Sequence, residues 1–158
     1  MEQARQQTIN ILSTSTNPEV LNFKNIIANE NNCWNDFVVP FNSLSKSAQT
    51  EIIDKLLSLN NNYINVRVAF LVADNEFAAD YLARHTSNKH ALCFLALYST
   101  DNIRLYLLQQ YPDDSFLISK IIAGMKNKSL VESYRNSTNP LIRNAFNVVI
   151  TNKFMIGM

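Results

Sequence analysis

The segment VRVAFLVADN, from Val66 to Asn75, has a counterpart 24 residues later in HALCFLALYS, from His90 to Ser99, and the match pairs the letters AFL with CFL. The same spacing of 24 residues joins ISKIIAGMKN, which begins at Ile118, to IRNAFNVVIT, which begins at Ile142. A further segment, VLNFKNIIAN, begins at Val20. A unit that recurs at a regular spacing is typical of repeat architectures, in which consecutive units stack on one another.

These five segments share an apolar pattern that predicts helices. Their first, fourth and eighth positions are mostly apolar, and this spacing places them on one stripe of an α-helix. His90 and Cys93 hold the first and fourth positions of their segment, so we expect both in the core. The fifth position adjoins the stripe and widens it, and is occupied by Lys24, Phe70, Phe94, Ile122 and Phe146.

Shorter amphipathic stretches lie between the segments and predict a second set of helices. They are AQTEIIDKLLSL from Ala48, EFAADYLARH from Glu76, DNIRLYLLQQ from Asp101 and SLVESYR from Ser129. The chain has 22 Asn and only two Gly, and Asn both caps helices and tolerates the left-handed backbone at their ends. Pro18 and Pro140 each follow an Asn and mark helix starts, and Ser129 with Glu132 has the spacing of a capping box.

We therefore predict an all-α fold, a short α-solenoid of about five helix pairs with a repeat of roughly 24 residues. Residues 1–158 form a single domain, with an N-terminal cap at 1–15, repeats at 16–152 and an apolar C-terminal tail, KFMIGM, at 153–158. An exposed tail is rarely so apolar, so we expect Phe154 and Ile156 to dock on the last repeat or on a partner.

A two-helix cycle of this length resembles the leucine-rich repeat variant, a relative of the HEAT and armadillo α-solenoids. The resemblance lies in VRVAFLVADN and the residues up to Asn102, and in LIRNAFNVVITN from Leu141 to Asn152, where a Val-Arg or Ile-Arg pair opens a helix. The arginine is absent from the segments at His90 and Ile118. The resemblance implies a stack of helix pairs that binds a macromolecule, and it names no partner.

Composition limits the function classes. The net charge of +1 gives no whole-molecule attraction to nucleic acid or to an anionic membrane. No apolar run approaches the roughly 20 residues of a membrane span, and the first residues lack the pattern of a signal peptide, so we expect a cytoplasmic protein. Cys33 and Cys93 are then expected to be buried free thiols. The Asn, Ile and Lys bias suggests an A/T-rich genome such as that of a phage or another virus.

No combination of residues predicts catalysis or a bound cofactor. His85, His90 and Cys93 offer a thiol, a base and part of a zinc shell, but nothing nearby completes either arrangement, and structural roles are favoured. Asp113 with Asp114, and Asp74 with Glu76, are the available carboxylate pairs, and Asp113 and Asp114 are expected to form a solvated turn that caps the next helix. We therefore predict a protein that is not an enzyme and holds no metal.

The favoured hypothesis is a non-catalytic module that binds another protein, such as a phage or viral adaptor or inhibitor of a host protein. It is expected to be a monomer or homodimer that does not bind membranes. A nucleic-acid-binding α-solenoid and an accessory subunit of an enzyme are the alternatives. Arginines suit phosphate contacts and tyrosines suit stacking or interface anchoring. The candidate partner-binding residues are Arg67, Arg84, Arg104, Arg135, Arg143, Tyr81, Tyr106, Tyr134, Phe154 and Ile156.

Overall fold

The computed structural model describes residues 2–155 and the side chains of residues 2–152. Within this range the chain is helical and has no strand, which confirms the all-α prediction. The helices are α1 (Glu2–Leu12), α2 (Pro18–Ala28), the 3₁₀-helix η1 (Trp34–Phe37), α3 (Val38–Asn42), α4 (Lys46–Leu57), α5 (Asn62–Val72), α6 (Glu76–His85), α7 (Lys89–Tyr98), α8 (Asp101–Gln110), α9 (Ser115–Gly124), α10 (Lys128–Ser133) and α11 (Pro140–Met155).

Asparagine side chains cap the N-termini of several of these helices, as the composition predicts. The side chain of each capping Asn accepts a hydrogen bond from a backbone N–H of the first turn, which would otherwise lack a partner inside the helix. The N-cap asparagines of α2, α5, α6, α7 and α10 are Asn17, Asn61, Asn75, Asn88 and Asn127. Asn60, just before α5, has a positive φ of 49°, a conformation that Asn tolerates better than most residues.

Other boundary predictions have mixed outcomes. Pro18 and Pro140 are the first residues of α2 and α11, as predicted. The predicted capping box of Ser129 and Glu132 is wrong, because α10 begins at Lys128 and Asn127 accepts the hydrogen bonds from Ser129 N and Leu130 N. The N-cap residue of α10 is therefore Asn127, two residues before Ser129.

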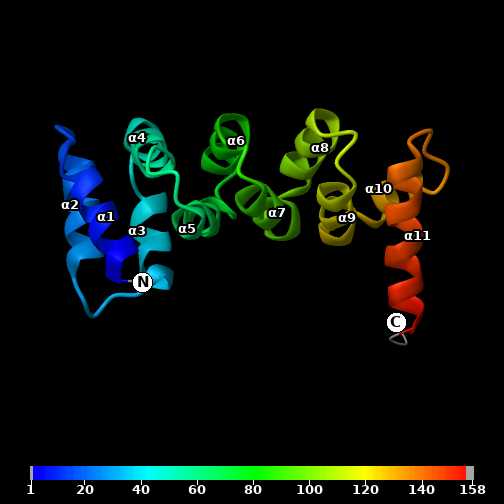
Figure 1. The fold of residues 1–158 in the computed structure, drawn as a ribbon, viewed down its shortest axis with the longest axis horizontal. Helices are drawn as coiled ribbons and strands as arrows, with labels where there is room; N and C mark the ends of the chain where they lie inside the picture. Colours follow the sequence, from blue (N-terminus) through cyan, green and yellow to red (C-terminus); the bar gives the residue numbers. More distant parts are fainter. Residues whose placement is uncertain (1, 156–158) are drawn as a thin grey trace.

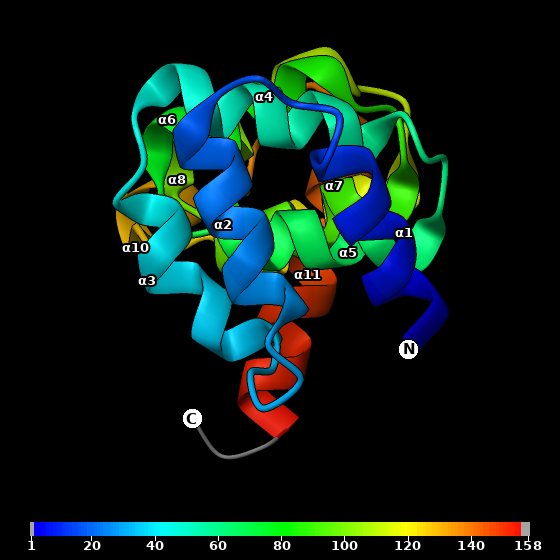
Figure 2. The ribbon, with the colours of Figure 1, turned by 90° about the vertical axis from the view of Figure 1, so that its left-hand side faces the viewer.

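Helices α4 to α9 alternate between two rows of an elongated array, and α11 stands upright at its C-terminal end (Figure 1). In the odd row, α5 packs against α7, α7 against α9, and α9 against α11, in the order of the chain. In the even row, α4 packs against α6 and α6 against α8. At the N-terminal end, α1 packs on α2 and α4, and the three helices α1, α2 and α3 lie across that end of the array (Figure 2).

The core lies between the two rows and continues into the N-terminal end. Val68 of α5, Leu82 of α6 and Leu95 of α7 are almost fully buried, as expected for the inner faces of amphipathic helices. At the N-terminal end, the ring of Phe23 contacts Phe37 and Phe41 edge to face, with centroids 6.3 and 5.9 Å apart.

Hydrogen bonds connect neighbouring helices of a row. In the odd row, Ser99 Oγ donates to Ala73 O at 2.7 Å and Asn88 Nδ2 donates to Asn62 Oδ1 at 2.7 Å, and both pairs are 26 residues apart. In the even row, the hydroxyl of Tyr81 donates to Asp54 from 27 residues away. These spacings are longer than the predicted cycle of roughly 24. Phe70 and Phe94 occupy equivalent positions in the predicted alignment. Their rings contact each other between α5 and α7.

Three predicted burials are wrong. His90, expected in the core, is exposed, and Cys33, expected to be a buried thiol, is exposed as well. Cys93 is only half-buried. His90 is the second residue of α7, and the buried residues of this helix are Ala91, Leu92, Leu95 and Ala96. The inner face of α7 is therefore rotated away from the predicted stripe.

Helices occupy both ends of the described chain. The N-terminal cap contains α1, whose Arg5 donates to Ile27 O, Asn29 O and Asn32 O at the C-terminal end of α2. At the other end, the helical backbone of α11 continues through Met155, into the segment predicted as the apolar tail. The predicted docking of Phe154 and Ile156 concerns side chains outside the described part of the chain.

Candidate protein-binding surface

Three aromatic side chains gather on the outer surface of the odd row. Phe70 of α5 contacts Phe94 of α7 edge to face, with ring centroids 6.2 Å apart and an interplanar angle of 70°. Tyr98, one helical turn after Phe94, stands 4.7 Å from it at an angle of 50°. Phe70 and Phe94 are half-buried, whereas Tyr98 is 57% exposed. We refer to Phe70, Phe94 and Tyr98 as the aromatic cluster.

The aromatic cluster surrounds a shallow pocket with one carboxylate beside it. The pocket has a volume of about 440 Å³, and Ala73 and Asp74 complete its lining. Asp74 is exposed, and its carboxylate has no hydrogen bond or ion pair with any described side chain. The pocket therefore combines aromatic walls with a negative charge that the chain itself leaves available.

A buried hydrogen bond holds the two sides of this pocket together. Ser99 Oγ donates to Ala73 O at 2.7 Å, and both groups are enclosed by protein. Ser99 follows Tyr98 directly and Ala73 precedes Asp74, so this bond fixes the C-terminal ends of α5 and α7 relative to each other. The pocket is built by regular helix ends and not by a long loop, which favours a preformed surface.

A second group of candidate residues lies on the even row. The polar groups of these residues interact with other groups of the chain. Tyr81 OH donates to Asp54 Oδ1 at 2.8 Å, and burial, with the neighbouring Asp54, raises the pKa of this tyrosine. Arg84 forms an ion pair with Asp80 at 2.9 Å, and its guanidinium lies 4.3 Å from the ring centroid of Tyr106. Tyr81, Arg84 and Tyr106 thus lie together on one polar surface. Their side chains interact with Asp54, with Asp80 and with one another.

The remaining arginine candidates lie elsewhere. Arg67 of α5 covers the ring of Tyr63 at 4.9 Å. Near the C-terminal end, Arg135 pairs with Glu132 at 3.0 Å, and Arg143 donates to Ser137 O at 2.6 Å. Tyr134 is half-buried, and burial raises the pKa of its hydroxyl. These candidates do not join the even-row group in one continuous surface.

Arg104 was a predicted partner-binding residue, and the structure contradicts this prediction. Its side chain is completely buried. The guanidinium donates to Ala96 O at 2.6 Å, to Leu97 O at 3.0 Å and to Asp101 Oδ1 at 2.9 Å. Arg104 therefore binds the C-terminal carbonyl groups of α7, which have no partners within their helix, and it is inaccessible to another molecule.

Asp101 completes the buried arrangement around Arg104. Its carboxylate also accepts hydrogen bonds from the backbone N–H groups of Lys126 and Asn127, which lie in the turn after α9. Burial opposes ionisation of Asp101, but these hydrogen bonds and Arg104 together lower its pKa. Arg104 and Asp101 of α8 thus connect this helix to the C-terminal end of α7 and to the turn after α9, which is a structural role.

The candidate catalytic and metal-binding residues do not form a site. His85 stacks on Tyr81 at the end of α6, while His90 and Cys93 lie on α7. Burial raises the pKa of the Cys93 thiol, which disfavours the reactive thiolate. Among the described residues, no group of three or more His, Cys, Asp or Glu side chains is arranged to hold a metal ion. No helix in residues 2–155 has the length and apolar composition needed to cross a membrane.

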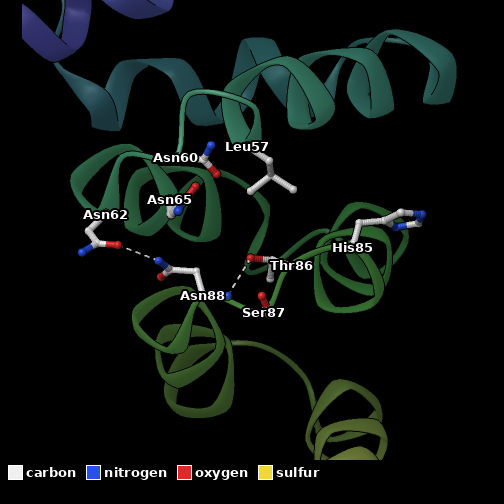
Figure 3. Close-up of a pocket in the computed structure, with 8 residues that line it drawn as sticks. All are labelled: Leu57, Asn60, Asn62, Asn65, His85, Thr86, Ser87 and Asn88. Atoms are coloured by element: carbon white, nitrogen blue, oxygen red, sulfur yellow. Dashed lines mark hydrogen bonds between the residues drawn. The ribbon is translucent and has the colours of Figure 1, made fainter.

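A polar pocket lies between the turn before α5 and the turn before α7 (Figure 3). Its volume is about 340 Å³. Asn65 belongs to its lining and is almost fully buried, and the side-chain oxygen of Asn65 accepts no hydrogen bond from the described residues. Asn62, Asn88 and Thr86, by contrast, are connected by hydrogen bonds along the pocket wall (Figure 3). The pocket is lined by Leu57, Asn60, Asn62, Asn65, His85, Thr86, Ser87 and Asn88.

Replacing Asn65 with leucine is expected to leave stability unchanged or to raise it by about 1 kcal/mol. A buried polar atom without a partner costs about 1 to 3 kcal/mol, and leucine of similar size removes that cost. The measurement is urea-induced unfolding followed by circular dichroism. A loss of stability greater than about 1 kcal/mol would show that the Asn65 side chain makes favourable hydrogen bonds.

Comparison of the chain with protein families, with curated proteins and with solved structures finds no match.

Sequence reasoning missed the aromatic cluster and Asp74 as site residues. The sequence pattern places Phe70 and Phe94 in the widened buried stripe, and it offers Asp74 only as a carboxylate pair with Glu76. The signal that they share is the 24-residue spacing between Phe70 and Phe94, which reflects ring contact across adjacent helices.

Proposed function

We propose that the chain is a non-catalytic α-solenoid module that binds another protein through the outer surface of its odd row. The observation that carries the proposal is the aromatic cluster around its pocket on this surface. Tyrosine and other aromatic side chains are enriched among the residues that contribute most to protein–protein binding, because they bury a large apolar area with little loss of conformational entropy.

The arrangement of the helices supports the α-solenoid part of the proposal. Helices of the odd row follow one another in chain order, and hydrogen bonds recur between residues 25 to 27 apart. Stacked helix pairs of this kind present extended surfaces, which suit binding to macromolecules. The repeat would then be about 26 residues long, and the likeness to HEAT-type solenoids is part of the proposal.

The even row is a weaker candidate for the binding surface. Two pairs of its charged side chains are bound within the chain, Arg84 with Asp80 and Lys55 with Glu51. The nucleic-acid alternative requires a continuous basic surface. Arg104 is buried, and the other candidate arginines are dispersed and bound by groups of the chain itself. Binding to another protein is therefore favoured over nucleic acid.

The proposal predicts that Tyr98→Ser abolishes capture of a protein partner. The immobilised chain is exposed to a lysate of its source organism, and retained proteins are identified by mass spectrometry. At least one protein should be retained by the wild type and reduced about tenfold or more by Tyr98→Ser, since loss of a central aromatic contact costs about 2 kcal/mol or more.

The matched control is Leu105→Ser, which changes an apolar side chain of α8 in the even row that is 39% exposed. Capture should survive this control. Retention that depends on Leu105 and not on Tyr98 would place the binding surface on the other row. Retention of nucleic acid that weakens with salt would favour the alternative.

A further inference from the structure

The pocket of the aromatic cluster has the chemistry of a site for an organic cation. The faces of aromatic rings carry negative charge density, and they attract ammonium and guanidinium groups. Phe70 and Phe94 meet at 70°, and Tyr98 adds a third ring, so the walls face a common space from different directions. Asp74 lies at the same pocket and supplies a full negative charge.

Elsewhere on the molecule, five aromatic rings are each covered by a cation of the chain itself. Lysine or arginine groups lie 4.3 to 4.9 Å from the ring centroids in five pairs. No lysine or arginine among the described side chains of residues 2–152 covers Phe70, Phe94 or Tyr98. The pairs are Lys46 with Phe77, Arg67 with Tyr63, Arg84 with Tyr106, Lys120 with Phe116, and Arg135 with Phe146.

We infer that the pocket formed by Phe70, Phe94, Tyr98 and Asp74 binds an organic cation, an alkylammonium or guanidinium group, supplied from outside the chain. The inference rests on the proposed function in placing the binding surface on the odd row, and it adds the chemical class of the group that is bound. Such a group is either a lysine or arginine side chain of the protein partner or the head of a small quaternary ammonium compound. Charge complementarity with Asp74 selects a cation over a neutral apolar group of the same shape.

The test compares choline with 3,3-dimethylbutan-1-ol, the uncharged compound of the same shape, by NMR titration of the full chain. Choline should bind with a Kd in the millimolar range, and the shifted aromatic signals should be those of the aromatic cluster. The neutral compound should bind about tenfold more weakly, because it lacks the attraction to the rings and to Asp74. Equal binding of the two compounds, or no localised shift at about 50 mM choline, would overturn the inference.

Two variants and one control locate the site. Asp74→Asn should weaken choline binding about threefold or more at low salt, and Tyr98→Leu should weaken it further, since a π-face is lost. Asp113→Asn changes another exposed carboxylate, located in the turn before α9, and should leave binding unchanged. Both site variants alter exposed side chains, and circular dichroism checks that they fold. Equal effects of Asp74→Asn and Asp113→Asn would show non-specific attraction and contradict the site.

Further probes distinguish the two sources of the cation. N-acetyl-lysine methylamide and N-acetyl-arginine methylamide represent side chains of a protein, and choline represents a small quaternary ammonium compound. Tighter binding of either amino-acid derivative assigns the pocket to a side chain of the partner, whereas tighter binding of choline assigns it to a quaternary ammonium group. If no cation binds while Tyr98→Ser still abolishes capture of a protein, the cation site is wrong and the protein-binding proposal stands.

Discussion

Replacing Arg104 with alanine is expected to lower the free energy of unfolding by about 3 to 5 kcal/mol, the loss typical of removing one partner of a buried ion pair. The guanidinium is fully buried and donates to Asp101 Oδ1, Ala96 O and Leu97 O. Its removal leaves these acceptors without their donor and opens a cavity between α7, α8 and α9. Urea-induced unfolding followed by circular dichroism measures the change.

Arg84→Ala is the matched control for this prediction. The ion pairs of Arg84 with Asp80 and of Arg104 with Asp101 have the same N–O distance of 2.9 Å, but the side chain of Arg84 is 52% exposed. Exposed ion pairs contribute little to stability because water solvates their charges in both states. We therefore expect a much smaller change for Arg84→Ala. Similar losses for the two variants would show that burial is not the source of the Arg104 effect.

Gly124→Ala is expected to destabilise the chain by about 1 to 3 kcal/mol or more, through overpacking between α7 and α9. A Cβ atom at this position would lie 2.3 Å from Ala96 O and 2.8 Å from Arg104 Nε. The first of these atoms belongs to the backbone and cannot move aside without separating the two helices. Thermal unfolding, with midpoints compared between variant and wild type, measures the effect.

Gly124→Ala would instead raise the stability of the chain if helix propensity dominated at this position. Alanine is favoured over glycine in a helix by up to about 1 kcal/mol, so Gly124→Ala would then be stabilising. A melting temperature equal to or above that of the wild type would contradict the close approach of α7 and α9 at Gly124.

Helices α6 and α8 were predictable from the sequence because their signals are local. EFAADYLARH and DNIRLYLLQQ are the whole of α6 and α8, and Asn75 and Thr100 cap them through hydrogen bonds that span three residues. Local pattern and capping residue agree in these segments, so little depends on the rest of the fold.

The aromatic cluster and the buried Arg104 were not predictable because both depend on packing between helices. Phe70 and Phe94 fit a widened apolar stripe, and only the packing of α5 against α7 decides that their rings stay half-buried and contact each other. An arginine in a polar stretch predicts a solvated side chain. Arg104 is buried because Gly124 lets α9 approach α7, a contact between residues far apart in the sequence. His90 is the opposite case to Arg104. It occupies a mostly apolar position of the repeated segments, and yet it is exposed.

Hydroxyl-radical footprinting of the chain, alone and bound to the captured protein, tests the binding surface most directly because it reports the exposure of individual side chains. We predict that binding protects Tyr98 and Phe94 of the odd row from oxidation, while Leu105 and Tyr106 of the even row remain as reactive as in the free chain. Protection of Leu105 and Tyr106 with unchanged reactivity of Tyr98 would contradict the account.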